Sequence, residues 1–234
     1  MRAVYSALLT LTLGACVACG APAPKAPAPV AALPSVDLTL KTVALVSQRD
    51  EDGLRAYCSG VWLDADTIVT AAHCVDGEEE GAILGYLAYT DVYGTGFEAA
   101  PPLAARPAVL TTVDEAHDLA LLHAPKAPSH AWAPLANESP AAGDHVAAMG
   151  HPLGLWWSYS EGVIASVRQT KLGLDIVWVQ ATAQISPGNS GGGLFNDKGE
   201  LVGVCSRAMS SSRAQALNFW VHVAYVRQLR GPKA

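Results

Sequence analysis

Short apolar runs rich in β-branched residues recur along this chain, and turn-forming residues separate them. No long stretch has the 3.6-residue period of an amphipathic helix, and only residues 224–230 suggest a short one. The pattern predicts an all-β protein, with a small barrel or sandwich in each half. A Pro-rich connection at 124–140 separates the two halves. The strands predicted before it lie at 42–48, 57–63, 67–70, 82–90, 108–112 and 119–123. The strands predicted after it lie at 145–149, 161–168, 175–183, 193–195, 201–206 and 217–223.

Composition limits the possible partners. The chain has 234 residues, of which 50% are hydrophobic and 15% charged, so it is long enough to bury a sizeable core. Its formal net charge is −6, whereas a nucleic-acid-binding protein needs a basic face. We therefore expect no nucleic-acid partner.

Residues 1–15 are predicted to be a signal peptide. A positive start at Arg2 precedes an apolar run at 3–13 that is too short to span a membrane. The string Leu13-Gly14-Ala15-Cys16 resembles the bacterial lipobox, in which the cysteine is lipidated and becomes the first residue. An ordinary secretory signal, or lipidation at Cys19, is the alternative.

Residues 16–37, rich in Pro and Ala, read as an extended tether behind the lipidated Cys16. We expect export to the bacterial cell envelope, in the periplasm or at the outer membrane. The lipid would be the membrane contact, and secretion is the other possibility.

The stretch Ser186-Pro187-Gly188-Asn189-Ser190-Gly191-Gly192 sets a serine among glycines. Glycine allows positive φ and close approach of the backbone to another group. A serine hydroxyl is a poor nucleophile unless a base takes its proton. A candidate base, His73, lies in Thr-Ala-Ala-His-Cys, and a candidate acid, Asp118, opens Asp-Leu-Ala-Leu-Leu. The order His, Asp, Ser is that of the chymotrypsin arrangement.

Taken together, these three strings resemble the trypsin-like serine proteases, and 180–192 and 149–154 most resemble the bacterial HtrA/Deg group. The resemblance covers about 43–229. It implies two six-stranded antiparallel Greek-key barrels with a short C-terminal helix, in a domain at 38–234. Barrel one is expected at about 38–124, the linker at 125–140 and barrel two at 141–234. We expect no PDZ domain after barrel two, which departs from the full HtrA architecture and its regulated oligomer. The oligomeric state stays open, with a monomer slightly preferred.

The resemblance also assigns roles to single residues. Ser190 would be the nucleophile, His73 the general base and Asp118 the residue that orients His73, while the backbone N–H groups of Gly188 and Ser190 would form the oxyanion hole. The walls of the substrate pocket would be Gln184, Ile185 and Ser186 on one side and Ser206, Arg207 and Ala208 on the other. Since position 184 carries no acid, we expect small or medium apolar side chains before the cut; Arg207 leaves an acidic preference open.

Two cysteines, Cys58 and Cys74, are expected to pair in an exported protein, and many trypsin-like proteases have a disulfide at this place. Cys205, in an apolar strand, reads as a small buried hydrophobe. The remaining histidines show no paired ligand spacing, so neither a metal nor another cofactor is expected. The leading hypothesis is a serine endopeptidase acting on unfolded or extended polypeptide. A non-catalytic or activator-dependent binding module with this fold, or a general esterase, is the alternative.

Overall fold

The computed structural model describes residues 43–50, 53–88, 106–124, 131–155, 157–171, 175–211 and 214–232. The predicted signal peptide, the lipidation at Cys16 and the tether therefore lie outside the described residues. No helix in the described ranges is long and apolar enough to cross a bilayer.

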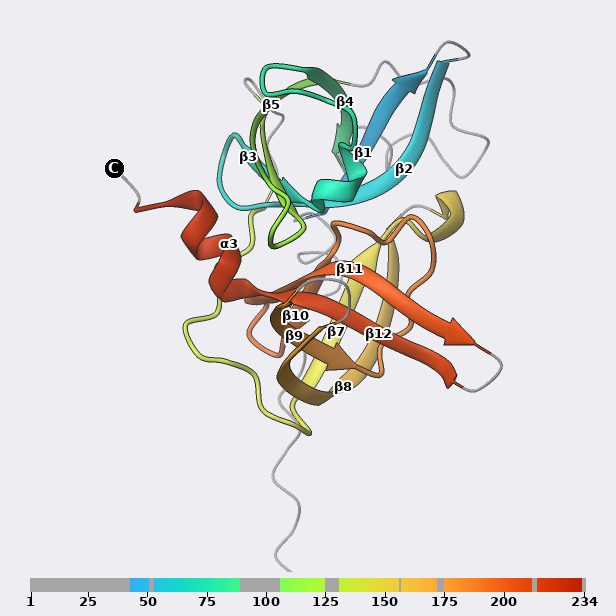
Figure 1. Cartoon of the computed structure of the whole chain (residues 1–234), viewed down its shortest axis with the longest axis vertical. Helices are drawn as coiled ribbons and strands as arrows, with labels where there is room; N and C mark the ends of the chain where they lie inside the picture. The colour runs from blue at the N-terminus through green and yellow to red at the C-terminus, as the bar shows by residue number, and fades with distance from the viewer. Residues whose placement is uncertain are drawn as a thin grey trace, which may run out of the picture. The chain divides into compact units, whose positions relative to one another are not determined.

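The first barrel closes from six antiparallel strands in the order β1-β2-β3-β6-β5-β4 (Figure 1). Because β6 returns to lie beside β3, the connection is a Greek key. The strands are β1 (Val43–Asp50), β2 (Gly53–Trp62), β3 (Thr67–Thr70), β4 (Ile83–Ala88), β5 (Arg106–Asp114) and β6 (Leu119–His123).

The second barrel also has six antiparallel strands, in the order β10-β11-β12-β9-β8-β7. The helix α3 (Val223–Arg230) follows it directly, and the His222 imidazole accepts a hydrogen bond from the Ala224 N–H at the start of this helix. The strands are β7 (His145–Gly150), β8 (Ser158–Lys171), β9 (Asp175–Ala181), β10 (Gly193–Asn196), β11 (Leu201–Ser211) and β12 (Ala214–His222).

The prediction of an all-β fold with two six-stranded barrels and one short C-terminal helix is confirmed. The ends of the strands differ most in the second barrel. There β11 runs to Ser211 and β12 begins at Ala214, well past the predicted ends, because the two strands pair along their length whatever the polarity of their side chains. Two 3₁₀ turns, η1 (Ala72–Cys74) and η2 (Pro152–Gly154), were not predicted.

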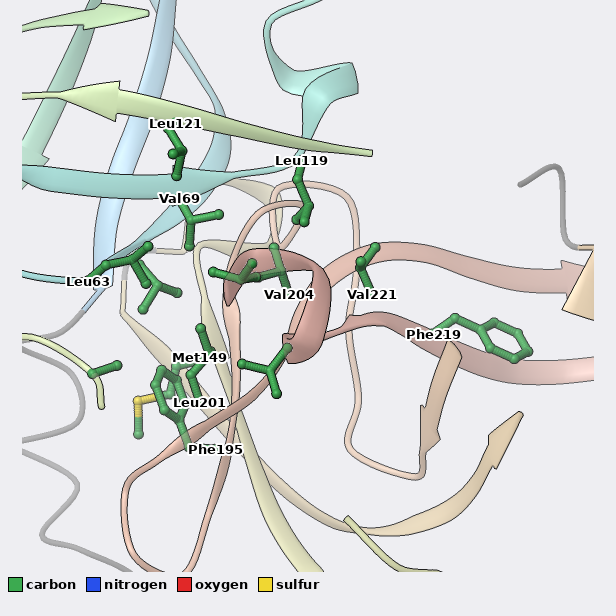
Figure 2. Close-up of a cluster of buried hydrophobic side chains, with 14 of the residues drawn as sticks. Leu63, Val69, Leu119, Leu121, Met149, Phe195, Leu201, Val204, Phe219 and Val221 are labelled. Carbon is green, nitrogen blue, oxygen red and sulfur yellow. The ribbon is translucent and has the colours of Figure 1, made fainter. Parts of the chain in front are cut away.

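Among the residues that the structure describes, buried side chains form three hydrophobic cores. One fills each barrel, and a third is shared by strands of both barrels (Figure 2). The residues of the shared core labelled in the figure are Leu63, Val69, Leu119 and Leu121 of the first barrel and Met149, Phe195, Leu201, Val204, Phe219 and Val221 of the second.

The strand β6 contributes side chains to two of these cores, one on each of its faces. Leu119 and Leu121 belong to the shared core, whereas Ala120 and Leu122 belong to the interior of the first barrel. Alternate residues of a strand point to opposite faces, so burial on both faces explains the unbroken apolar run. Asp118, which directly precedes β6, is thereby placed at the junction of the two barrels.

Candidate active site

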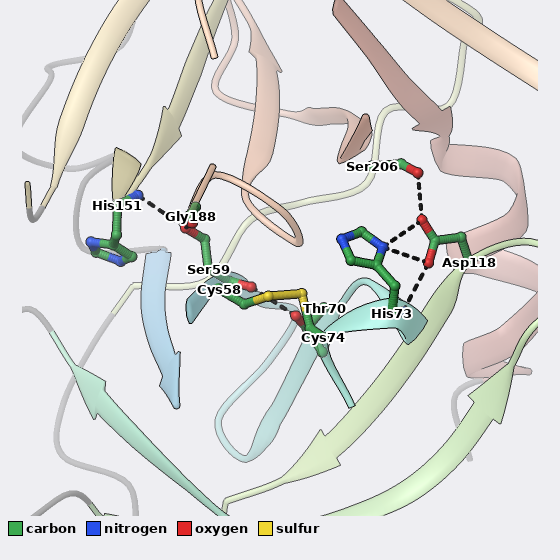
Figure 3. Close-up of a disulfide and its surroundings, with 9 residues drawn as sticks. All are labelled: Cys58, Ser59, Thr70, His73, Cys74, Asp118, His151, Gly188 and Ser206. Carbon is green, nitrogen blue, oxygen red and sulfur yellow. Dashed lines mark hydrogen bonds and ion pairs between the residues drawn. A yellow bond between two sulfur atoms is a disulfide. The ribbon is translucent and has the colours of Figure 1, made fainter. Parts of the chain in front are cut away.

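His73 lies in η1, directly after strand β3. A disulfide between Cys58 of β2 and Cys74 joins this turn to the barrel wall, with the two Cα atoms 6.0 Å apart (Figure 3). The neighbours Ala72 and Cys74 are buried, while the His73 side chain remains 41% exposed. The turn is thus anchored on both sides of a histidine that stays accessible.

The Asp118 carboxylate contacts both the backbone N–H and the imidazole ring of His73 (Figure 3). Its Oδ1 accepts a hydrogen bond of 3.0 Å from the His73 N–H, and its Oδ1 and Oδ2 lie 2.9 Å and 3.0 Å from His73 Nδ1. A carboxylate can only accept, so Nδ1 carries the proton and Nε2 of the neutral ring is left as an acceptor. Asp118 has a φ of 53°, a left-handed conformation that Asp tolerates better than most residues.

One residue of the second barrel also contacts the Asp118 carboxylate. The Ser206 hydroxyl, from β11, donates to Oδ2. The sequence analysis predicts that Ser206 lies in the wall of the substrate pocket, and its hydroxyl contacts the acid. Because Asp118 is only 6% exposed, these donors replace the water that burial removes.

These contacts shift both titrating groups. Burial by itself raises the pKa of the Asp118 carboxyl, but the hydrogen bonds and charge of His73, with the Ser206 hydroxyl, hold it below its ordinary value. The hydrogen bond to Asp118 raises the pKa of His73 above its ordinary value of 6.5; partial burial and the charge of Arg207 oppose this rise. The pair therefore favours a carboxylate next to a readily protonated imidazole.

The loop that carries Ser190 begins with a tight turn. The Asn189 N–H donates to the Ser186 carbonyl over 3.0 Å, and Gly188 has a φ of 102°. Proline second and a positive-φ glycine third in a four-residue turn are the signature of type II. Among the described residues, neither the Gly188 N–H nor the Ser190 N–H donates a hydrogen bond, so both are available to an incoming oxygen.

Ser190 is half-buried, and its carbonyl accepts a hydrogen bond of 2.7 Å from the Ser59 N–H of β2. Its hydroxyl makes no hydrogen bond with the His73 ring in the described part of the chain. Catalytic hydrogen bonds are often long without substrate and shorten in the complex. The structure thus pairs His73 with Asp118 and does not pair His73 with Ser190.

The other predicted pocket residues differ in exposure. Gln184, Ser186 and Ala208 are exposed, and Ile185 is half-buried. Arg207, also half-buried, holds its guanidinium 5.1 Å from the ring centre of Trp178. No group of three or more His, Cys, Asp or Glu that could hold a metal ion occurs among the described residues.

Comparison with known proteins identifies the family of this chain. A family model described as a trypsin-like peptidase domain matches residues 58–204, more than half of the chain. The serine endoprotease DegS of Haemophilus influenzae is 36% identical over 87 residues, covering 35% of this chain and 26% of that protein. A probable periplasmic DegP-like serine endoprotease of Halomonas elongata is 42% identical over 72 residues, covering 30% and 15%. The matches thus span about a quarter of these relatives or less.

Two solved structures share the fold. A serine endoprotease from Yersinia pestis aligns with a TM-score of 0.61 at 24% identity, over 82% of this chain and 64% of that one. An inactive form of Rv3671c from M. tuberculosis aligns with a TM-score of 0.63 at 20% identity, over 84% and 88%. The match to the family model shows that the chain belongs to the trypsin-like peptidase domain family, and HtrA-type serine endoproteases are among its relatives.

Proposed function

We propose that this protein is an exported serine endopeptidase that cleaves unfolded or extended polypeptide through Ser190, His73 and Asp118. The observation that carries the proposal is the pairing of His73 Nδ1 with the buried Asp118 carboxylate, 2.9 Å away. That pairing leaves Nε2 as the base. His73 comes from the first barrel, whereas the turn whose Gly188 and Ser190 N–H groups donate no hydrogen bond within the described residues comes from the second.

Catalysis would proceed by acyl transfer. Ser190 Oγ attacks the carbonyl carbon of the scissile peptide, and its proton passes to His73 Nε2, while Asp118 stabilises the imidazolium. The N–H groups of Gly188 and Ser190 stabilise the oxyanion of the tetrahedral intermediate. The leaving amine then takes the proton from His73. In the second half of the reaction, water attacks the acyl-enzyme as His73 takes its proton, and His73 then returns that proton to Ser190 Oγ.

We propose the preferred side chain before the cut from the lack of charge on Gln184, in the predicted pocket wall. Gln184 offers no charge to pair with Lys or Arg, so small or medium apolar side chains are favoured before the cut. Arg207 supports the competing preference for acidic side chains, since its charge is close enough to act on His73. Its stacking on Trp178 favours the apolar preference, because the guanidinium already contacts a ring.

The proposed location is the bacterial cell envelope. Relatives include probable periplasmic endoproteases, which supports export. Lipidation at Cys16 is a separate proposal, tested by metabolic labelling with an alkyne fatty acid. Incorporation that Cys16→Ser abolishes and Cys19→Ser leaves unchanged would support it; loss with Cys19→Ser alone would move the lipid to that residue.

Cleavage of unfolded casein by the mature domain, with fluorophosphonate labelling alongside, tests the enzymatic proposal. Ser190→Ala should abolish both signals, while Ser166→Ala, which removes a hydroxyl from β8 of the same barrel, should leave both unchanged. Mass spectrometry of the products identifies the residue before each cut. Cleavage that survives in Ser190→Ala would refute the assignment of the nucleophile.

The missing hydrogen bond between Ser190 and His73 favours one other function, an activator-dependent or non-catalytic binding module. Such a protein would bind extended polypeptide beside its exposed strands without turnover. The same experiment separates the two functions. Binding of casein by wild type with neither cleavage nor labelling would favour the module.

A further inference from the structure

Ser59 of β2 contacts the proposed oxyanion loop with both its backbone and its side chain. It is fully buried, with 0% of its surface exposed. Its N–H donates to the Ser190 carbonyl over 2.7 Å. Its hydroxyl donates to the Gly188 carbonyl over 2.8 Å (Figure 3). One residue of the first barrel thus holds two successive parts of a loop that belongs to the second barrel.

The direction of the Ser59 hydroxyl proton is fixed. The His151 N–H donates to Ser59 Oγ over 3.0 Å, which occupies a lone pair of that oxygen. The Gly188 carbonyl can only accept, so the single hydroxyl proton points to it. Because the side chain is buried, water does not compete for these bonds.

This hydroxyl and one backbone N–H hold the two peptide planes on either side of Gly188. The plane before it is held by the Leu153 N–H, which donates to the Pro187 carbonyl over 2.7 Å. The plane after it is held at its carbonyl by the Ser59 hydroxyl, and the Asn189 N–H of the same plane also donates to the Ser186 carbonyl over 3.0 Å. In a planar trans peptide the N–H points opposite to the carbonyl, so the bond to Pro187 also directs the Gly188 N–H. Fixing the second plane holds the Gly188 Cα in place, so the Gly188 N–H can turn away only if the first plane flips.

Two glycines pack closely against Ser59. A Cβ on Gly150 would lie 2.9 Å from Ser59 Oγ, and a Cβ on Gly191 would lie 2.1 Å from the Ser59 carbonyl. If the hydroxyl were removed, the Gly188 carbonyl and the His151 N–H would each lose a buried hydrogen-bond partner. Rotation of the turn would then be the way to recover hydrogen bonds.

We propose that Ser59 is a positioning residue for the oxyanion hole, and that its hydroxyl keeps the Gly188 N–H aimed at the reacting carbonyl. The inference rests on the proposed function, since it concerns the same reaction. It adds a residue 129 positions away from Gly188 in the sequence, in the opposite barrel. Ser59 touches no reacting atom and acts through the loop alone.

The test compares Ser59→Ala with Thr70→Val. The Thr70 hydroxyl donates to the Ser59 carbonyl over 2.8 Å, so its loss removes a buried hydrogen bond to the same residue and leaves the bond from the Ser59 hydroxyl to the Gly188 carbonyl in place. For Ser59→Ala we expect kcat to fall about 10- to 100-fold, less than the loss of an oxyanion donor itself. KM should stay within about threefold, since substrate binding does not use the oxyanion.

A peptide aldehyde, which forms a tetrahedral adduct, provides the second readout: its Ki should rise by the same factor as kcat falls. Thr70→Val should change neither by more than about threefold. Thermal unfolding is recorded for each variant, and Ser59→Cys, of similar shape with a weaker donor, replaces the alanine variant if that one does not fold.

A kcat for Ser59→Ala within about threefold of Thr70→Val, or an effect on KM alone, would overturn the inference while leaving the endopeptidase in place. Wild-type protein that is neither labelled by fluorophosphonate nor inhibited by the aldehyde would overturn the proposed function and this inference with it.

Discussion

Replacing Gly188 by alanine is the sharpest test of the proposed oxyanion hole. Gly188 has a φ of 102°, and an added Cβ would lie 2.3 Å from the His151 carbonyl oxygen and 3.1 Å from the Leu153 nitrogen. Both of these atoms belong to the backbone, so neither can rotate away. Alanine therefore meets strain from its own φ and a collision with a neighbouring loop.

The smallest rearrangement that relieves this strain is a flip of the peptide between Pro187 and Gly188. A type I turn keeps the hydrogen bond from Asn189 to Ser186 but needs a negative φ at position 188, which alanine accepts. The flip turns the Gly188 N–H away from the position of the oxyanion. Loss of one such donor costs about 10²–10³ in kcat, or roughly 2.7–4 kcal/mol of transition-state stabilisation.

Gly143→Ala is the matched control. Gly143 has a φ of 93°, yet a Cβ there meets nothing within 4 Å. It should lose about 1–2 kcal/mol of stability through the left-handed backbone alone and keep its kcat. The assay is kcat and KM on a peptide taken from the casein cut sites, with thermal unfolding of both variants. If Gly188→Ala keeps kcat within about threefold of Gly143→Ala, the turn does not supply an oxyanion donor.

Three further predictions concern the pair of His73 and Asp118 and the disulfide. Asp118→Asn should lower kcat about 10⁴-fold on the same peptide, because the amide no longer selects the Nδ1–H tautomer; a loss below tenfold would contradict this role. His73 accepts a proton only when neutral and its pKa is raised, so kcat/KM should fall as the pH drops through a midpoint above 6.5, and a pH profile with a lower midpoint would be inconsistent with the pairing. The double variant Cys58→Ser/Cys74→Ser should lose about 3 kcal/mol of unfolding free energy in urea, relative to the oxidised protein, and an unchanged midpoint would show that the bridge does not stabilise the fold.

The strands were predictable because buried strands have runs of apolar residues in the sequence. The run Leu119–Leu122 is apolar at every position, since one face packs in the first barrel and the other in the shared core. The acid in front of it stood out against this run. The serine stood out among glycines whose added Cβ atoms would collide with Ser59 and Thr70, as at Gly191. Local sequence thus carries both the strands and the candidate catalytic residues.

The contacts between the barrels were not predictable in the same way. The hydroxyl of Ser206 donates to a carboxylate 88 positions earlier, and that of Ser59 to a carbonyl 129 positions later. A serine in a strand has the same local sequence whether its hydroxyl meets water or a distant acid. These partners depend on how the two barrels pack and on the register of their strands, which no periodicity records.

The two contacts also explain why the barrels must stay packed together. The first barrel supplies His73 and Asp118, yet the hydroxyl that helps hold Asp118 as a carboxylate comes from the second. The second barrel supplies Ser190, yet the hydroxyl that holds its loop comes from the first. Each half of the proposed machinery is therefore completed by the other half. The shared core is what holds these four groups in register, because its buried side chains come from strands of both barrels. A separated barrel would keep its own core and lose the polar partners, so the proposed activity belongs to the pair.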